Sequence, residues 1–200
     1  MGRMRGKSIF VLMVLGLLLT SGLAQAQLTV IGTATYLGTP YNLIWDDDNN
    51  GHSVVWLDYT NAPANWSTQT AWAAGLDAQL TYNIDPAYTV IWDDAAWRLP
   101  NTVDGQSDYG CDGTTTVGYN ITTSEMGHLF YAELGNQGYL DTSCNTQSPY
   151  GLQNTGSFEH LVASWYWSGT EYAPDPDYAW SFGFDDGFQV GYGIVLHNDG

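Results

Sequence analysis

Hydrophobic and polar positions alternate in short runs through the first part of the chain. Residues 28–37, 41–45 and 53–60 are rich in Val, Ile, Thr and aromatic side chains, which favours β-strands. The acidic cluster 46–51 lies between the last two runs and consists of Asp, Asn and Gly, the residues that turns favour. This part of the chain therefore predicts antiparallel strands joined by turns.

Two later segments have the spacing of amphipathic helices. In residues 67–80 the apolar positions recur at helical intervals, and Asn65 or Ser67 is placed to cap the first turn. In residues 124–135 the apolar side chains form one stripe after Ser124, a second capping residue. The pattern predicts two helices.

The rest of the chain is predicted as loop and strand. Residues 81–123 are mostly polar and rich in glycine, and the Leu-Pro that follows Arg98 favours an extended backbone there. Residues 164–172 alternate as a strand does, and 178–196 predicts a hairpin with an Asp-Gly turn. We therefore expect a single α+β domain over residues 27–200, with two helices and short antiparallel strands.

The beginning of the chain has a different character. Basic residues precede an almost wholly apolar run from Ile9 to Leu19, and the Ala-Gln-Ala at 24–26 is a small-x-small cleavage signal. The apolar run is shorter than the roughly 20 residues that a membrane-spanning helix needs. The sequence predicts a signal peptide over residues 1–26, no membrane insertion after its cleavage, and a secreted, periplasmic or cell-surface location.

Removal of the signal peptide changes the charge of the chain. The full sequence has 4 Lys and Arg residues against 21 Asp and Glu residues, and three of the basic residues lie in the signal peptide. Arg98 is then the only basic residue against 21 acidic ones, which gives a formal charge of −20 with His neutral. Such a surface repels nucleic acid and anionic lipid and favours divalent cations.

Cys111 and Cys144 are the two cysteines of the chain. Export favours a disulfide between them, and this bond would close a loop of about 34 residues and stabilise the fold by roughly 3–4 kcal/mol. The alternative is a pair of metal-binding or catalytic thiols. For that alternative the sequence offers no Cys-x-x-Cys spacing and no nearby His.

The acidic cluster also matches the first half of a calcium-binding loop. Asp46, Asp48 and Asn50 stand at alternate positions before a glycine, so their oxygens can converge on one hard cation. The twelfth position holds a leucine, and the nearest carboxylate belongs to Asp58. Calcium is one hypothesis for this cluster, and a solvated hairpin turn is the other.

Aromatic residues supply the candidates for ligand contact. Aromatic rings pack well against apolar faces of ligands and serve as interface anchors. Trp66, Tyr150 and Tyr172 lie near the edges of predicted loops, where a ligand could reach them. For five further tryptophans, which lie in regular or motif segments, we expect a place in the core: Trp72, Trp97, Trp165, Trp167 and Trp180.

Four motifs follow one another in a set order: WRLP at 97–100, SEMGHL at 124–129, YWSGTEY at 166–172 and YAWSFGFDDG at 178–187. Together with the upstream WLDYT and AWAAGL segments, they resemble the Lcl C-terminal domain family of exported bacterial domains, over most of residues 40–190. The resemblance implies a C-type-lectin-like fold, a relation to the sulfatase-modifying group, and a secreted or surface recognition domain. In a collagen-like adhesin, the matching domain is linked to the binding of sulfated polysaccharides.

The chain differs from that family in two places. Family members pass almost directly from Arg-Leu-Pro into a helix, whereas residues 101–123 intervene here. Members also end on a strand with Ala-Val-Arg, which this sequence lacks, so we expect the final strand to be missing or the sheet to close differently. A single arginine also argues against sulfated sugars, because recognition of sulfate normally uses Arg or Lys.

Arg98 is expected to have a carboxylate partner, since it is one cation among 21 anions. Glu125 and Glu171 both lie in the family-like motifs, and either could accept two guanidinium hydrogen bonds. The neighbouring Trp97 and Pro100 predict a partly buried site. The alternative is an anion-binding arginine.

Three classes of function follow from the sequence. The first, which we favour, is an exported non-enzymatic recognition domain whose partner is a polysaccharide or surface glycan. The second is a structural extracellular or envelope protein that organises divalent cations, with calcium as its cofactor. The third is an enzyme related to the sulfatase-modifying group, whose chemistry depends on reactive cysteines. Cys111 and Cys144 do not lie on motifs that match that group, so we do not favour this class.

Overall fold

Four antiparallel strands from the early part of the chain form the first sheet. The computed structural model describes residues 28–92 and 97–194, so the expected signal peptide lies outside the described residues. The sheet has the order β3-β2-β1-β4. Its strands are β1 Leu28–Tyr36, β2 Thr39–Asn49, β3 His52–Leu57 and β4 Thr81–Ile84.

The strand β2 is longer than its sequence predicts. We expected a turn over residues 46–51, but the strand continues to Asn49, and only Asn50 and Gly51 form the turn, with φ angles of 56° and 79°. The reason is that Asp46 and Asn49 are buried, and Nδ2 of Asn49 donates to Oδ2 of Asp46 at 2.8 Å. The strand therefore extends to Asn49 because the polar side chains of Asp46 and Asn49 are buried and bonded to each other.

The first helix, α1 (Trp66–Gly75), lies where the periodicity predicted it but ends earlier. Asn65 caps it, because its side chain accepts a hydrogen bond from the backbone N–H of Thr68 at 3.0 Å. The helix ends at Gly75, a residue with low helix propensity, and the chain continues in turns.

The second predicted helix is present in two parts. It begins as α2 (Glu125–His128), capped by Ser124 as expected, and continues as the π-helical turn η1 (Leu129–Glu133). The wider turn is visible in the hydrogen bond from the backbone N–H of Leu134 to the carbonyl of Leu129, five residues earlier.

Across residues 28–92 and 97–194, no helix has the length and apolar character that crossing a membrane requires.

Five strands form the second sheet, in the order β5-β6-β9-β8-β7. Only β5 and β6 run parallel, and both lie in the region predicted as loop. The predicted hairpin is confirmed, with Gly187 at a φ of 81° in its turn. The strands are β5 Tyr109–Gly110, β6 Val117–Gly118, β7 Trp165–Glu171, β8 Tyr178–Gly183 and β9 Gln189–Gly193.

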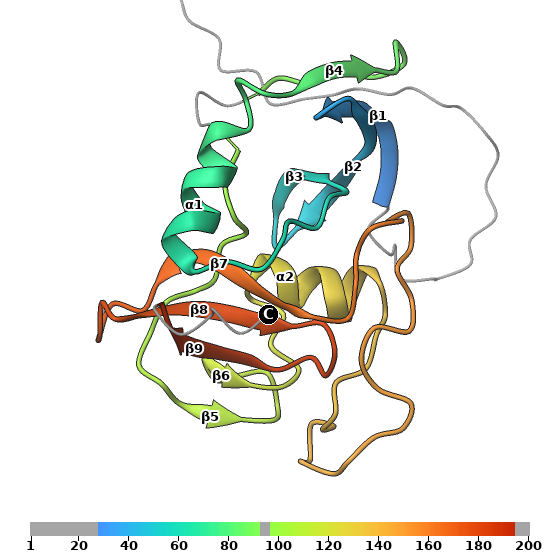
Figure 1. The fold of residues 1–200 in the computed structure, drawn as a ribbon. Helices are drawn as coiled ribbons and strands as arrows, with labels where there is room; N and C mark the ends of the chain where they lie inside the picture. Colours follow the sequence, from blue (N-terminus) through green and yellow to red (C-terminus); the bar gives the residue numbers. More distant parts are fainter. Residues whose placement is uncertain (1–27, 93–96, 195–200) are drawn as a thin grey trace, which may run out of the picture.

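The expected α+β fold class is confirmed, and the core explains how the parts are held together. In Figure 1 the helix α2 lies between the two sheets. Phe130 of η1 packs in one cluster with Ile44 of β2 and Phe182 of β8. A second cluster packs Leu76, just beyond α1, against Leu43 of the first sheet. Burial of each such side chain stabilises the fold by roughly 1.5–3 kcal/mol.

Candidate functional site

The segment that contains WRLP lies along β7 as an additional edge. The carbonyl of Pro100 accepts hydrogen bonds from the backbone N–H of Gly169 at 2.8 Å and from the hydroxyl of Ser168 at 2.9 Å. The backbone N–H of Thr102 donates to the hydroxyl of Thr170 at 3.0 Å, and that hydroxyl donates back to the carbonyl of Thr102. These bonds cover the open edge of the second sheet at β7.

Arg98 pairs with Glu125, one of its two expected partners. Its two terminal nitrogens donate to the two carboxylate oxygens at 2.7 Å each, and these bonds raise the pKa of Arg98. The site is partly buried, as Trp97 and Pro100 predicted, because the Glu125 side chain is only 16% exposed while the Arg98 side chain is 48% exposed. Glu171 is exposed near the end of β7 and, within the described residues, forms no ion pair with Arg98.

The Arg98–Glu125 pair lies at the base of the segment 101–123. Glu125 also accepts a hydrogen bond from the backbone N–H of Asn101 at 2.8 Å, and its own backbone N–H donates to the carbonyl of Asn101 at 3.0 Å. Both ends of segment 101–123 therefore lie at the Arg98–Glu125 pair. Between these ends it contributes β5 and β6 to the second sheet.

The disulfide between Cys111 and Cys144 is confirmed, with the two Cα atoms 5.4 Å apart. Cys111 follows β5, and Cys144 lies in the long connection between η1 and β7. The bond therefore fastens segment 101–123 to a second loop. It leaves neither cysteine as a free thiol.

The residues proposed as calcium ligands do not converge. The Asp58 carboxylate is buried and accepts hydrogen bonds from the backbone N–H groups of Glu159 at 2.9 Å and His160 at 3.0 Å. Asp48 is exposed, and its Oδ1 atom accepts a hydrogen bond from the backbone N–H of Gly51 at 2.9 Å. Over the described ranges, no group of three or more His, Cys, Asp or Glu side chains is arranged to hold a metal ion.

The other two calcium candidates take part in a contact between β2 and the second helix. The Asn50 side chain donates to the carbonyl of Ser124 at 3.4 Å, and the Asn49 side chain donates to that of Glu125 at 3.2 Å. Asp46 orients Asn49 for this contact through their mutual hydrogen bond. These polar residues therefore join the first sheet to α2.

Asp46 lies near a second buried acid, Glu133 of η1. The Oδ2 atom of Asp46 accepts from the indole of Trp56 at 3.2 Å, and its Oδ1 atom has no hydrogen-bond partner within the described part of the chain. His128 Nε2 is 3.1 Å from Glu133 Oε1. Burial and then the charge of Asp46 raise the pKa of Glu133, and the contact with His128 offsets this in part. We therefore expect the contribution of Glu133 to the stability of the fold to depend on pH.

The three aromatic ligand candidates lie in different surroundings. Trp66 is the first residue of α1, and its indole N–H donates to the carbonyl of Ser168 at 2.8 Å, so it anchors the helix to β7. Tyr150 is 42% exposed and packs edge-to-face against Tyr139, with ring centroids 5.0 Å apart. Tyr172 lines a pocket.

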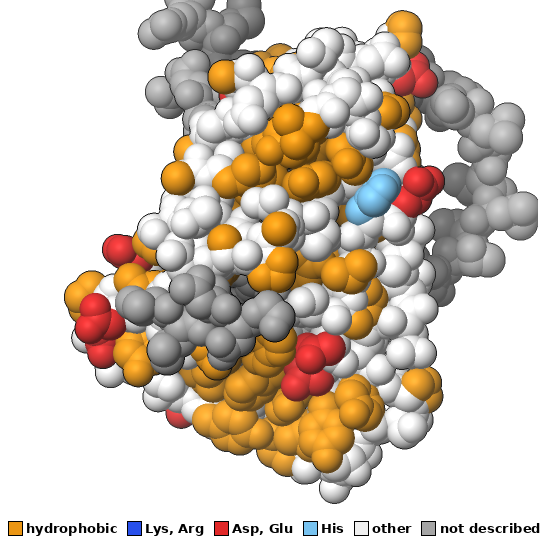
Figure 2. Space-filling view, in the orientation of Figure 1, with side chains coloured by type: hydrophobic (Ala, Val, Ile, Leu, Met, Phe, Trp, Pro, Cys, Tyr) orange, Lys and Arg blue, Asp and Glu red, His pale blue; other side chains and the backbone are white. Residues whose placement is uncertain are grey.

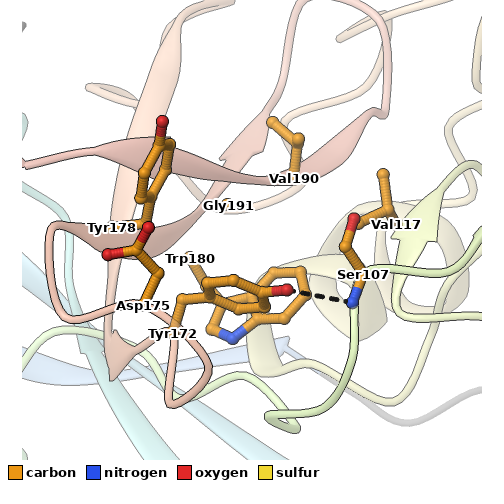
Figure 3. A pocket seen from close by; sticks show the side chains of 8 residues that line it. All are labelled: Ser107, Val117, Tyr172, Asp175, Tyr178, Trp180, Val190 and Gly191. Carbon is orange, nitrogen blue, oxygen red and sulfur yellow. Dashed lines mark hydrogen bonds between the residues drawn. The ribbon is translucent and has the colours of Figure 1, made fainter.

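That pocket has a volume of about 250 Å³ and is drawn in Figure 3. Four parts of the chain meet there: the segment before β5, the strand β6, the connection between β7 and β8, and the paired strands β8 and β9. Residues far apart in sequence thus share one site. The residues that line it include Ser107, Tyr172, Asp175, Tyr178, Trp180 and Gly191.

Aromatic rings form the interior of the pocket. Tyr172 packs edge-on against Trp180, with ring centroids 5.4 Å apart. The Trp180 indole is held in place because its N–H donates to Asp104 Oδ1 at 2.9 Å. Gly191 leaves the space open, since an added Cβ atom would meet only the Tyr172 ring, at 3.8 Å. A larger side chain at Gly191 would fill the pocket.

Polar groups surround this aromatic interior. In Figure 3 the Asp175 carboxylate and the Tyr178 ring lie on one side and Ser107 on the other. The Ser107 backbone N–H donates to the Tyr172 hydroxyl at 3.2 Å, which fixes the position of that ring. Tyr178 is 42% exposed, so its ring is accessible to a ligand. The pocket can offer ring faces together with a carboxylate and hydroxyl groups.

Sequence reasoning found Tyr172 but missed Asp175, Tyr178 and Ser107. The segment from Tyr172 to Tyr178, Tyr-Ala-Pro-Asp-Pro-Asp-Tyr, carried a usable signal, since two tyrosines flank a turn with acidic residues. No local pattern marks Ser107, because it enters the pocket only when β5 pairs with β6 and β6 pairs with β9.

Comparison of the chain with protein-family models, with curated proteins and with solved structures gives no match. The resemblance to the Lcl C-terminal domain family therefore depends on the motifs alone. In the structure these motifs lie together. WRLP contacts the start of SEMGHL through Arg98 and Glu125 and the YWSGTEY strand through Pro100, and that strand pairs with the strand of YAWSFGFDDG.

Proposed function

We propose that this protein is an exported, non-enzymatic recognition domain that binds a neutral carbohydrate in the pocket of Tyr172, Asp175 and Tyr178. The observation that carries the proposal is the combination, in one pocket, of the exposed Tyr178 ring and the half-buried Tyr172 ring with a carboxylate and hydroxyl groups. A sugar ring presents an apolar C–H face and several hydroxyl groups. An aromatic ring can pack against the C–H face of the sugar, and neighbouring polar groups can form hydrogen bonds with its hydroxyl groups.

The charge of the chain favours a neutral ligand. Across the described ranges Arg98 is the only Lys or Arg residue, and its guanidinium is already engaged by Glu125. Asp175 is the one charged side chain in the pocket lining. An anionic or sulfated sugar would therefore meet repulsion rather than an ion pair.

Two features support binding rather than catalysis. The described residues that line the pocket include no imidazole, thiol or ammonium group to act beside Asp175. The disulfide also occupies both cysteines, whereas chemistry of the formylglycine-generating kind needs a reactive thiol. An oxidising compartment is where such a disulfide persists, which supports export.

We also propose that the chain is a member of the Lcl C-terminal domain family and has a C-type-lectin-like fold. The support for this is the contact between motifs that are far apart in the sequence, centred on the Arg98–Glu125 pair and on Pro100. A set of motifs that meets in space is more informative than the same motifs scattered over a surface.

A glycan array tests the proposed function. The wild type is applied in calcium buffer and in chelator, beside the variants Gly191→Val, which fills the pocket, and Asp175→Asn, which removes its charge. Val162→Ala, at a side chain 49% exposed, serves as the matched surface control. We expect signals on neutral glycans that the control retains and Gly191→Val loses.

Three outcomes separate the alternatives. Binding that disappears in chelator would favour the cation-organising class. Signals that Gly191→Val leaves unchanged would exclude this pocket. An array without wild-type signals would contradict carbohydrate recognition by the pocket altogether.

A further inference from the structure

A second group of aromatic side chains lies on the other face of the second sheet, outside the pocket. Tyr166 and Phe182 pair across β7 and β8 and face the core, so Trp165, one residue earlier, faces the opposite side. From Trp165 a series of ring contacts extends across β9 and β5 into the loop that carries Cys144. We call this group the aromatic band; its members are Trp165, Phe188, Tyr109, Tyr119, Tyr139 and Tyr150.

The rings of the band are in continuous contact. Phe188 lies at the centre, with its centroid 6.2 Å from that of Trp165, 6.3 Å from that of Tyr109 and 5.0 Å from that of Tyr119. Tyr119 is 6.4 Å from Tyr139, which in turn contacts the last ring of the band. Each separation falls in the range of favourable aromatic pairs.

Three tyrosines of the band are open to solvent. Tyr109 is 58% exposed, Tyr150 42% and Tyr139 39%, whereas Tyr119 is only 8% exposed and supports them from below. Figure 2 shows hydrophobic side chains gathered over the lower part of the molecule, where Figure 1 places β5, β6 and β9. Exposed aromatic groups of this extent commonly mark a binding surface.

The exposed rings are held by covalent and hydrogen bonds rather than by the core. The disulfide joins Cys111, two residues beyond Tyr109, to the loop between Tyr139 and Tyr150. The Asn120 side chain fastens the same two segments, donating to the carbonyl of Cys111 at 2.7 Å and to that of the residue after Tyr139 at 3.0 Å. The band is therefore preorganised, which lowers the entropic cost of binding.

The loop that carries Tyr139 and Tyr150 is itself braced. Isolated bridges pair Leu140 with Thr146 and Gln137 with Gly151, so the two tyrosines face each other across a closed loop. The backbone N–H of Tyr139 also donates to the carbonyl of Asp186, in the turn between β8 and β9, at 2.7 Å.

Charge decides which kind of partner fits the band. One carboxylate in contact with the band is that of Asp186, which accepts a hydrogen bond from the hydroxyl of Tyr119 at 3.5 Å, and Asp108 and Asp141 lie close to Tyr109 and Tyr139 in the sequence. Repulsion disfavours anionic polymers and lipid surfaces, and it disfavours a second copy of a chain with a formal charge of −20 beyond the signal peptide. An uncharged partner with apolar faces and many hydroxyl groups meets neither obstacle.

We propose that the aromatic band is a platform for an extended neutral polysaccharide chain, whose sugar rings stack on Tyr109, Tyr139 and Tyr150. This inference rests on the proposed function, because it assigns to the same domain a second contact with carbohydrate, long enough for a polymer, in addition to the pocket. The tyrosine hydroxyls and Asp186 supply hydrogen-bond partners along the platform.

Affinity electrophoresis tests the platform with probes of defined composition. The protein with its disulfide intact migrates through native gels that contain dextran, hydroxyethylcellulose or galactomannan, all neutral and soluble. We expect at least one polymer to retard the wild type, and Tyr109→Ala, Tyr139→Ala and Tyr150→Ala each to weaken the affinity by about three- to tenfold. The matching Tyr→Phe variants retain the ring and are expected to stay close to the wild type.

Controls separate this inference from the pocket. Gly191→Val is expected to keep its retardation by the polymer while it loses signals on the glycan array, whereas Tyr150→Ala is expected to do the reverse. Val162→Ala controls for an exposed apolar side chain elsewhere. Thermal melting shows that each variant is folded, and Tyr150→Ala, in a loop, still tests the platform should Tyr109→Ala disturb β5.

Three results would overturn the inference. The first is a wild type that no neutral polymer retards. The second is folded band variants that are retarded as strongly as the wild type. The third is sedimentation that shows a wild-type dimer which Tyr139→Ala dissociates, because the band would then be an interface between copies of this chain.

Discussion

Arg98 and Glu125 share two hydrogen bonds of 2.7 Å, and through them the extended WRLP segment is held at the first residue of α2. Glu125 also accepts the backbone N–H of Asn101. A carboxylate in the first turn of a helix is favourable in itself, because it faces the positive end of the helix dipole. One acidic side chain thus begins a helix, binds the sole arginine of the described chain and closes the base of segment 101–123.

Removal of the arginine is expected to destabilise the fold moderately. Arg98→Ala leaves the shielded Glu125 without its charged partner, yet the guanidinium itself is half exposed, so the loss is smaller than for a buried ion pair. We expect the free energy of unfolding to fall by about 1–2 kcal/mol, which corresponds to about 3–6 °C in Tm. Thermal unfolding followed by circular dichroism measures this.

The two glutamates named by the sequence provide a matched pair of controls. Glu125→Gln is expected to lower Tm as Arg98→Ala does, and Glu171→Gln is expected to leave it unchanged. In the double variant Arg98→Ala/Glu125→Gln the losses should be less than additive, since the two side chains form one interaction. Additive losses, or a wild-type melting curve for Arg98→Ala, would show that the pair contributes no stability.

Much of the fold could be predicted from local sequence patterns, namely most of the strands and both helices. The run at 28–37 and the stripe at 124–135 identified β1 and the second helix, because alternation and helical spacing express which face is buried. The acidic cluster was misread as a turn for a physical reason. Asp46 is buried through side-chain hydrogen bonds to Asn49 and Trp56, and composition alone does not reveal such bonds.

The candidate site was less accessible to sequence reasoning than the fold. Tyr172 could be named as a candidate, but the pocket also needs Ser107 and Gly191, which come together only when β6 pairs with β9. Tyr150 could be named as well, yet its contact with Tyr139 depends on how the loop is closed. Long-range pairing of short strands decides both sites, and no local periodicity encodes it.

The disulfide is expected to contribute a large part of the stability of the second sheet. It connects residues 33 positions apart, so its removal frees a loop in the unfolded chain. We expect the variant Cys111→Ala/Cys144→Ala to lose about 3–4 kcal/mol in free energy of unfolding, measured by urea denaturation. The same loss should follow reduction of the wild type, and a reduced protein as stable as the oxidised one would contradict the prediction.

The buried acids predict an unusual dependence of stability on pH. Burial and the Asp46 carboxylate raise the pKa of Glu133 in the folded protein above its unfolded value of about 4.3. A carboxyl group with a raised pKa contributes its full stability below the unfolded pKa and loses it as pH rises through the folded pKa. Glu133→Gln cannot ionise, so its free energy of unfolding, relative to the wild type, is expected to increase from about pH 4.3 until the pH exceeds the folded pKa of Glu133, and then to stay constant.

Urea denaturation of both proteins at a series of pH values up to 8 measures this difference, and Asp46→Asn identifies its source. That variant keeps one oxygen for Asn49 and Trp56 but removes the neighbouring charge, so the pH-dependent difference at Glu133 should become smaller without disappearing, because burial is the larger cause. His128 Nε2 lies 3.1 Å from Glu133 Oε1, and His128→Gln in both backgrounds separates the contribution of this contact. A difference between Glu133→Gln and the wild type that stays constant with pH would show that Glu133 keeps its ordinary pKa.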